Sequence, residues 1–515
     1  MPFATVIIDG TSTDNFHTYT IGFEKYMRDG DAYLCGNFTT AILLGGKRDK
    51  MVPQNSKIFR GSHFIFGPLT GSEDPEDVEI EFLAGGFRTP NGVEVGPDNA
   101  TYVTDNQGIF NPSNELIRIT PGSFYGHYLY NTNGGKRSAF QPEGVVAEKG
   151  DVRMMTPATV HLPQNDAARS PAQPHVIRDR KGVLAPYNGQ ILLCEFTMGR
   201  VLRVALEEVE GVWQGVAFKH SGGIADESGG NGFTGAPNRI EVGPDGHYYI
   251  GQIGAGGLWQ FNNRYTGLQR FRVKRAEEVS PTFNEILTVK VAEGGFEVEF
   301  LKPLPKDSLK VGEIEVSQWT YQPSSGYGGA PVGKEGLKPE RIEFDSTGKK
   351  MRLYVDGLKD ASPEFIIESG GKSSENSGWV VHVKMKPKKG EKSLLYTEEF
   401  WYTMLKKRGG AGHGKAVAMT ESEKAAMKFQ TQCAACHREL DNGWGAPNLS
   451  GILGREQVVI RDGKEVRVKV DRDYLINAIM YPHREKPKAF KEGAMPPLGL
   501  SKEEVESMVE YILTL

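Results

Sequence analysis

The chain has 515 residues, enough for two to four domains that each bury a core of their own. Charged residues make up 24% of the sequence and nearly cancel to a net charge of −4, so the composition indicates neither nucleic acid nor a membrane surface as a partner. No stretch has the length and apolar content of a transmembrane helix. The 63 glycines and the short β-rich segments up to about residue 400 predict a mainly β protein with a small all-α domain at its end.

Residues 1–285 contain an irregular repeat in which a polar turn precedes an apolar strand, and a second strand follows. The spacing of the turns is too uneven for a solenoid, but it suits β-propeller blades of about forty to fifty residues with inserted loops. We therefore predict a six-bladed β-propeller, two of whose blades are too divergent to place. The turns lie at 28–33, 96–102, 187–191 and 243–249.

Four propeller segments stand in an order that resembles the glucose/sorbosone dehydrogenase type of propeller, most closely its haem-fused relatives from planctomycete-like bacteria: Gly86–Gly92, Tyr102–Asn106, Asn114–Arg118 and Gly122–His127. The resemblance implies oxidation of a sugar, with pyrroloquinoline quinone as cofactor and calcium near the quinone. Arg88 matches an arginine that holds the quinone in this family. The early His-x-Gly-Gly segment that carries the catalytic base of the family has no counterpart here, and Gly61–Phe64 is the nearest segment.

Oxidation of an alcohol needs a base near the hydroxyl group, and a neutral imidazole has a suitable pKa. The candidates are His63, His127, His161 and His175, and we assign His63 and His127, together with Arg88, to catalysis. The alternative for each histidine is a structural role with hydrogen-bonded ring nitrogens. Asp105 and Asn106 are candidates for the axial mouth of the propeller, and their alternative role is to cap a turn between strands.

Residues 286–404 alternate apolar and polar side chains in short strands, which predicts a β-sandwich that acts as a spacer. Cys35 and Cys194 occupy comparable strand positions, and we expect two buried thiols rather than a disulfide. Residues 405–414 are rich in glycine and predict a flexible link to a final domain at 415–515.

Cys433, Cys436 and His437 form a C-x-x-C-H pattern, which indicates covalent attachment of haem c. A helix-like run with Ala425 and Phe429 on one face precedes the pattern. The chain ends in a capping box at 501–504, followed by apolar residues at helical spacing.

The order of these features over about the last hundred residues closely resembles the class I cytochromes c. The resemblance implies that His437 and Met495 are the axial ligands of the haem iron and that Pro447 orients the histidine. Met480 and His483 are alternatives to Met495. Ligation by histidine and methionine raises the reduction potential and suits electron transfer. Residues 457–470 are an insertion with a predicted hairpin turn at 461–464.

We expect an exported haem c oxidoreductase in which the propeller oxidises a sugar or polyol-type alcohol and the cytochrome domain passes electrons to a soluble or membrane electron-transfer protein. The alternative is a non-catalytic electron-transfer cytochrome whose propeller and sandwich bind carbohydrate or a partner protein. Haem c attachment indicates a periplasmic or otherwise extracytoplasmic location. Residues 1–9 lack the features of a signal peptide, so we expect a leader, and further upstream sequence, to precede this numbering.

Overall fold

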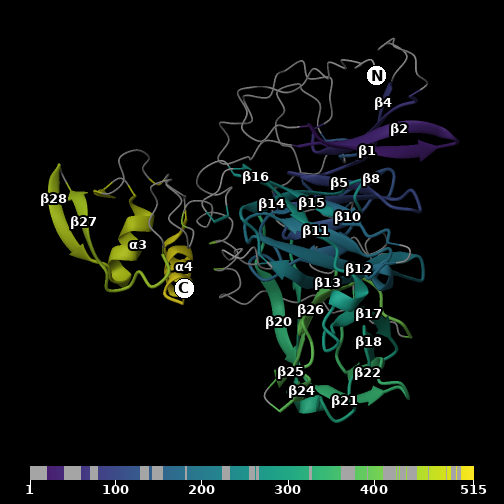
Figure 1. Cartoon of the computed structure of the whole chain (residues 1–515). Helices are drawn as coiled ribbons and strands as arrows, with labels where there is room; N and C mark the ends of the chain where they lie inside the picture. The colour runs from purple at the N-terminus through teal and green to yellow at the C-terminus, as the bar shows by residue number, and fades with distance from the viewer. Residues whose placement is uncertain are drawn as a thin grey trace.

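The computed structural model of the chain describes the residues to which every structural statement below refers: 20–39, 60–69, 79–127, 138–141, 155–179, 182–222, 232–254, 261–262, 266–323, 327–360, 377–390, 392–409, 425, 429, 437, 449–461, 463–482, 484–488, 495 and 500–514. Among these residues the fold is mainly β, as predicted, with helices near the C-terminal end (Figure 1). No described helix has the length and hydropathy needed to cross a bilayer.

The described part of the propeller consists of four sets of strands, antiparallel except for β8, whose first strands follow one another along the chain (Figure 1). The first contains β1(Thr20–Arg28), β2(Asp31–Phe38), β3(Ser62–Gly67) and β4(Glu79–Gly85), with the short β8(Ser123–Phe124) parallel to β4. The second contains β5(Gly92–Val95), β6(Thr101–Asp105), β7(Asn114–Arg118) and β9(Val160–Leu162). The third contains β10(Pro171–Val176), β11(Ile191–Glu195), β12(Arg200–Val209) and β13(Val212–Gly222). The fourth contains β14(Ala236–Val242), β15(Tyr248–Ile253) and β16(Thr266–Phe271).

The first strands of these sheets lie against one another in sequence order, β1 on β5, β5 on β10 and β10 on β14. Such contacts are those of innermost blade strands around a propeller axis. Gly92 allows the close approach of β5 and β10, because a Cβ atom there would lie 2.5 Å from Cα of Gln173. The count of six blades stays a prediction, since the described residues supply four sheets.

The polar turns of the sequence repeat are hairpin turns in three of the four sheets, between β1 and β2, β5 and β6, and β14 and β15. Each turn contains a residue with left-handed backbone: φ is 52° at Asp29, 61° at Asn99 and 74° at Gly246. Asparagine, aspartate and glycine tolerate this conformation better than other residues. The repeat in the sequence therefore reflects the need for a residue with left-handed backbone in the hairpin turn of each of these three blades.

The predicted sandwich residues form one complete sheet and half of another. The four-stranded sheet has the order β17(Ile286–Ala292), β18(Gly295–Phe300), β22(Lys350–Val355) and β21(Pro339–Phe344). The facing strands are β19(Ile314–Tyr321), β20(Pro331–Leu337), β23(Trp379–Met385) and β26(Glu399–Met404), and β24(Lys388–Lys389) pairs with β25(Lys392–Ser393) in a small ribbon. A buried cluster that includes Phe296, Met351 and Phe400 fills the space between the layers.

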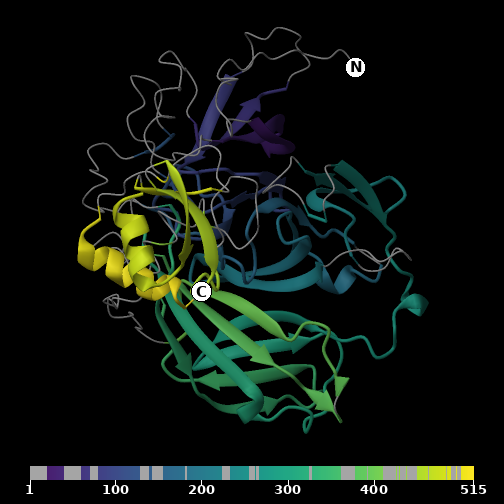
Figure 2. The same cartoon turned by 90° about the vertical axis from the view of Figure 1, so that its left-hand side faces the viewer.

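Strand β13 of the third blade pairs with β26, so the blade and the facing sandwich layer form one eight-stranded sheet. Its order is β10-β11-β12-β13-β26-β23-β19-β20, and Figure 2 shows the strands of both regions side by side. Val216 and Phe218 of β13 belong to the same buried cluster as the sandwich residues. The domain boundary expected at 285/286 stays a prediction, and this sheet crosses it.

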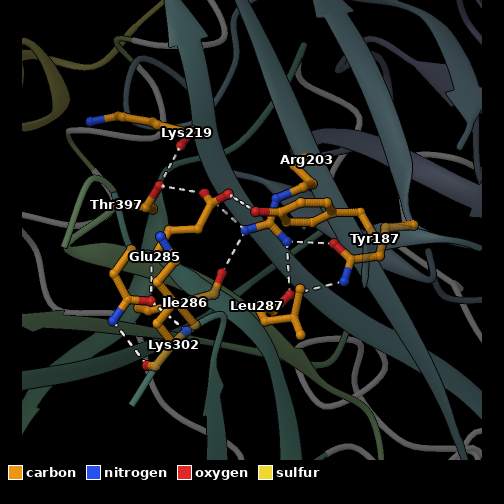
Figure 3. Close-up of polar contacts among 10 residues, drawn as sticks. Tyr187, Arg203, Lys219, Glu285, Ile286, Leu287, Lys302 and Thr397 are labelled. Atoms are coloured by element: carbon orange, nitrogen blue, oxygen red, sulfur yellow. Dashed lines mark hydrogen bonds and ion pairs between the residues drawn. The ribbon is translucent and has the colours of Figure 1, made fainter. Parts of the chain in front are cut away.

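A buried ion pair joins the blade to the start of the sandwich (Figure 3). The Arg203 side chain on β12 is 0% exposed, and its Nη2 lies 3.4 Å from Oε2 of Glu285, just before β17. Nη2 also donates to the carbonyl oxygen of Ile286 at 2.6 Å, and the Tyr187 hydroxyl donates to Glu285. Because these bonds join groups from separate chain segments in a buried setting, the network fixes the relative position of the segments.

The described C-terminal part contains α3(Arg472–Met480), α4(Lys502–Ile512) and a small sheet of β27(Glu456–Arg461), β28(Lys464–Lys469) and β29(Glu485–Pro487). The predicted capping box starts α4, since Ser501 accepts from the backbone N–H of Glu504 at 3.2 Å and Glu504 accepts from that of Ser501 at 2.8 Å. The ring of Phe429 lies 5.4 Å from that of Tyr511 on α4. The predicted hairpin turn at 461–464 is confirmed between β27 and β28.

Cys35 and Cys194 are both buried and unbonded, which confirms the prediction of two thiols. Burial raises the pKa of each thiol to about 12. Neither is therefore a reactive thiolate at neutral pH.

Candidate functional site

Four of the predicted haem residues, Cys433, Cys436, Pro447 and His483, lie outside the described residues. His437 is described and partly buried. Met495 packs against the hydrophobic cluster of the C-terminal domain, and so does Met480 at the end of α3. Packing therefore does not distinguish the two methionines, and ligation by His437 and Met495 stays a prediction.

Arg88 and His127, two of the predicted catalytic residues, lie together beside Gly108. A Cβ atom at Gly108 would be 2.7 Å from Nδ1 of His127 and 2.9 Å from Cβ of Arg88. The guanidinium carbon of Arg88 lies 5.1 Å from the ring centroid of Tyr327, so a sandwich-side residue covers it. Burial, with a smaller contribution from Arg88, lowers the pKa of His127 to about 3.

The backbone N–H of Ile109 donates to Nδ1 of His127 at 3.1 Å. The proton of the neutral His127 ring therefore resides on Nε2, which makes this nitrogen a hydrogen-bond donor. The assignment of His127 to catalysis stays a prediction.

His63, the third predicted catalytic residue, lies apart from this pair on β3. Its Nδ1 is 2.8 Å from Oδ1 of Asn37, whose amide nitrogen donates to the carbonyl oxygens of Pro90 and Gly92. The proton of His63 is therefore on Nδ1. Nε2 is buried and has no hydrogen-bond partner among the described residues, and burial lowers the pKa of His63 to about 3.

Asp105, at the end of β6, acts as a cap for the connection between the first two blades. Its carboxylate accepts from the backbone N–H groups of Arg88 at 2.8 Å, Thr89 at 2.7 Å and Asn106 at 2.8 Å. Glu195 at the end of β11 does the same in the next blade, accepting from Arg169 at 3.0 Å and from Ser170 and Met198, each at 2.7 Å. This equivalence supports the turn-capping role of Asp105.

A small cavity of about 20 Å³, room for about one water molecule, lies between the second blade and the sandwich. Its walls are mostly apolar, and the polar residues among them are Glu115, Thr156, His161 and Ser377. The propeller supplies most of the lining, and loops near β19 and β23 complete it: Phe110, Pro112, Glu115, Tyr125, Met155, Thr156, Pro157, Ala158, His161, Pro323 and Ser377. The spacer role expected for the sandwich stays a prediction.

Strand register brings three titratable residues into one row beside this cavity. Asp105 on β6 lies opposite Glu115 on β7, and Glu115 lies opposite His161 on β9. Residues directly opposite one another in adjacent strands project from the same face of the sheet. Burial, and next the charge of Asp105, raise the pKa of Glu115 well above its ordinary range.

His161 is held in place through both ring nitrogens. Nε2 lies against the carbonyl oxygen of Ser377 and so carries the proton, while Nδ1 is 2.6 Å from Oγ of Ser113. Burial lowers the pKa of His161 to about 4. The ring is thus neutral and engaged, which corresponds to the structural alternative considered for each histidine.

Glu115 is the residue that sequence reasoning missed. It is 4% exposed and lines the cavity, and among the described residues its carboxyl makes only a 3.7 Å contact with Nδ1 of His161. The signal in the sequence was a carboxylate next to Leu116 and Ile117 in a predicted strand. His175, the remaining candidate, lies on the inner strand β10, 3.6 Å from Oε2 of Glu94.

The described cavity does not fit pyrroloquinoline quinone, which carries three carboxylates. Its walls contain the carboxyl of Glu115 and no lysine or arginine, so nothing there neutralises an anion. Arg88 supplies a cation nearby, but it is only 7% exposed beneath Tyr327. No group of three or more histidine, cysteine, aspartate or glutamate side chains in the described part of the chain is arranged to hold a metal ion.

Residues 422–515 match the family model of cytochrome c. The C-terminal part of the chain is thus a cytochrome c domain, as the sequence predicted, and the match supports haem c as its cofactor. No curated protein matches the chain.

Several solved structures are similar to part of the chain. A putative oxidoreductase (glucose dehydrogenase) from Thermus thermophilus is 18% identical, with 44% of this chain and 57% of that chain covered and a TM-score of 0.27. The PQQ-bound aldose sugar dehydrogenase of Streptomyces coelicolor is 13% identical, with coverages of 45% and 56% and a TM-score of 0.25. The PQQ domain of pyranose dehydrogenase from Coprinopsis cinerea is 12% identical, with coverages of 47% and 69% and a TM-score of 0.28. The chain spans less than two thirds of the first two, and at these TM-scores the likeness carries no argument about function.

Proposed function

We propose that the chain is a haem c oxidoreductase whose β-rich part oxidises a sugar or polyol-type alcohol and whose cytochrome c domain passes the electrons to a separate electron-transfer protein. The observation that carries the proposal is the cytochrome c domain at 422–515 on the same chain as a propeller-like β body. A haem accepts one electron at a time. A haem domain joined to a large β region therefore suits an oxidation whose electrons are passed on one at a time.

The proposed reaction has a fixed stoichiometry. Oxidation of an alcohol to a carbonyl compound releases two electrons and two protons, and a ferric haem accepts one electron. Two ferric haems are therefore reduced for each alcohol oxidised. An extracytoplasmic location belongs to the same proposal, because haem c is normally attached there.

The test is the visible spectrum of the oxidised protein mixed with a panel of sugars and polyols, with and without pyrroloquinoline quinone and calcium. We expect the haem bands to shift to the reduced form with two haems reduced per substrate. The arms with and without the quinone show whether a region outside the described cavity takes it up. Reduction by ascorbate but by no substrate under any condition would overturn the proposal in favour of a carrier whose propeller and sandwich bind carbohydrate or a partner protein.

Covalent haem attachment is tested separately by replacing the two thiols. We expect Cys433→Ala together with Cys436→Ala to abolish covalent haem, because each thiol forms one bond to the porphyrin. Denaturing electrophoresis with haem staining measures the result, and Cys35→Ala is the matched control. Covalent haem retained in the double variant would contradict the assignment.

A further inference from the structure

We propose that Glu24 makes the packing of the first blade sensitive to pH: the protonated side chain allows β1 to pack closely against the other inner strands, and its ionisation as the pH rises through neutrality weakens that packing. The proposal concerns the propeller itself, so it holds whether or not the propeller oxidises an alcohol. Two features carry it, namely the backbone geometry beside Glu24 and a surplus of carboxylates among the inner strands.

The backbone fixes this part of β1 against the second blade. β1 lies against β5, and a Cβ atom at Gly22 would be 2.2 Å from Cγ1 of Val93. Gly22 has a φ of 76°, which residues with a side chain rarely adopt. The pairing of β1 with β2 shifts in register between Ile21 and Glu24, and such a bulge changes the direction of the side chains beside it. Glu24 therefore follows a segment that approaches β5 closely.

The side chain of Glu24 lies at the rim of an apolar interface. Glu24 is directly opposite Cys35 on β2, and residues opposite one another project from the same face of a sheet. Cys35 is 0% exposed and belongs to the buried cluster that includes Val93, and Tyr26 packs against this cluster from the same face of β1. The neighbouring Lys25 is on the opposite, exposed face. Glu24 is itself partly buried, which disfavours its charged form.

The inner strands bring three carboxylates and one guanidinium group within electrostatic reach of one another. Glu94 on β5 is 3% exposed, and its Oε1 lies 2.6 Å from Nη2 of Arg178, just after β10. Glu241 on β14 accepts from the uncharged side-chain amide of Gln173 at 3.1 Å. In the part of the chain that the structure describes, no cation is paired with Glu24. Ionisation of all three carboxylates therefore leaves a surplus of negative charge.

Other titratable and charged groups near this cluster do not remove the surplus. The Cys35 thiol is neutral, because burial raises its pKa to about 12. His175 on β10 faces Glu94, with 3.6 Å between Nδ1 and Oε2, and it is a cation only when protonated. Arg239 on β14 donates to the side chain of Asn238 at 2.6 Å. A substitution of Glu24 leaves these groups unchanged and so isolates its own effect.

Burial, and next the charges of Glu94 and Glu241, raise the pKa of Glu24 to about 7, against a smaller lowering by Arg178. The ordinary value of 4.5 applies to the unfolded chain. Between pH 4.5 and 7 the unfolded chain therefore loses a proton that the folded chain retains, and stability falls as the pH rises. The contribution of Glu24 is complete below pH 4.5 and is lost as the pH rises through 7.

The experiment compares urea unfolding of the full haem-loaded chain with that of Glu24→Gln at pH 5, 6, 7 and 8. The glutamine keeps the shape of the side chain and does not titrate. The ratio of folded to unfolded protein in Glu24→Gln, relative to the wild type, should rise by up to about tenfold for each pH unit from 5 to 7 and level off by pH 8. Glu79→Gln, at an exposed position of β4, is the matched control, and its ratio to the wild type should stay constant.

Hydrogen exchange measured by mass spectrometry locates the effect. At pH 8, peptides covering β1 should exchange faster in the wild type than in Glu24→Gln, and the difference should be much smaller at pH 5. Peptides covering β12 should exchange equally in both proteins. Glu241→Gln removes one neighbouring charge and should move the pH-dependent range to lower pH. A constant ratio for Glu24→Gln from pH 5 to 8, an unchanged range in Glu241→Gln, or equal exchange of β1 at pH 8 would overturn the proposal.

Discussion

Asp105 and Glu195 occupy the same place in consecutive blades, and each carboxylate accepts three backbone N–H groups. We expect Asp105→Ala to lower the free energy of unfolding by at least about 2 kcal/mol, because a buried donor left unpaired costs roughly 1–3 kcal/mol. Urea unfolding followed by circular dichroism measures the loss. Glu195→Ala should give a loss of similar size. If Asp105→Ala removed substrate-dependent haem reduction at unchanged stability, Asp105 would be a site residue instead of a cap.

Met495 is assigned to the haem iron through the resemblance to class I cytochromes c, and Met480 packs against the same cluster. Met495→Ala should lower the haem reduction potential and open the iron to added ligands, because a thioether ligand favours ferrous iron. A spectroelectrochemical titration with and without imidazole measures both effects. Met480→Leu is the control and should leave the potential near that of the wild type. The reverse pattern would make Met480 the ligand.

The residue scale also shows where sequence reasoning reached its limit. The alternatives for Asp105 depended on which backbone N–H groups come near it, and these belong to a connection about sixteen residues away in sequence. Glu115 and His161 meet because β7 pairs with β9, and residues 119–159 between these strands give no local signal of that pairing. The motif at 433–437 was recognisable because haem attachment requires its residues to be adjacent in the chain.

At the scale of elements, the pair of Arg203 and Glu285 holds β12 against the start of β17 (Figure 3). Glu285→Leu should lower the free energy of unfolding by about 3–5 kcal/mol, because it leaves a buried cation without its partner. Arg203→Met combined with Glu285→Leu should recover part of that loss. Denaturant unfolding of the single and double variants measures the difference.

The exposed pair of Arg272 and Glu278 is the matched control for the junction. The Arg272 side chain is 50% exposed, and ion pairs at the surface contribute little to stability because solvent screens them. Glu278→Leu should therefore change the stability much less than Glu285→Leu. Equal effects of the two substitutions would show that the buried pair does not anchor the junction.

Local signals predicted elements well where the backbone itself requires a residue type. The turns before β2, β6 and β15, the capping box of α4 and the hairpin between β27 and β28 are all present. The alternation of apolar and polar side chains predicted sandwich strands because one face of each such strand is buried. The pairing of β13 with β26 could not be predicted, because strand alternation shows which face is buried and leaves the identity of the neighbouring strand open.

At the scale of the whole molecule, buried neutral histidines make stability depend on pH. Burial lowers the pKa of His63 and His127 to about 3 and that of His161 and His220 to about 4, from an ordinary 6.5. The unfolded chain takes up these protons below pH 6.5 and the folded chain does not. Their contribution to stability is therefore complete above pH 6.5 and is lost as the pH falls toward 3–4.

A variant isolates this effect from the carboxyl groups. His127→Asn keeps an acceptor for the backbone N–H of Ile109 but does not titrate. Its stability relative to the wild type should rise by up to about 1.4 kcal/mol for each pH unit below 6.5. Urea unfolding at pH 7, 6 and 5 measures the trend. A constant difference across this range would show that His127 titrates normally in the folded protein.

The continuous eight-stranded sheet also bears on how such a protein can arise and be divided. In a chain shortened to end at residue 285, β13 would lose β26, and Val216 and Phe218, now 0% exposed, would face water on an open strand edge. Such edges recruit other strands and lead to aggregation. Recombination between genes could therefore append a haem domain after the sandwich with little disturbance, whereas exchange of the sandwich alone would demand a compatible edge on the blade. Blade and sandwich are thus expected to have been inherited as one unit.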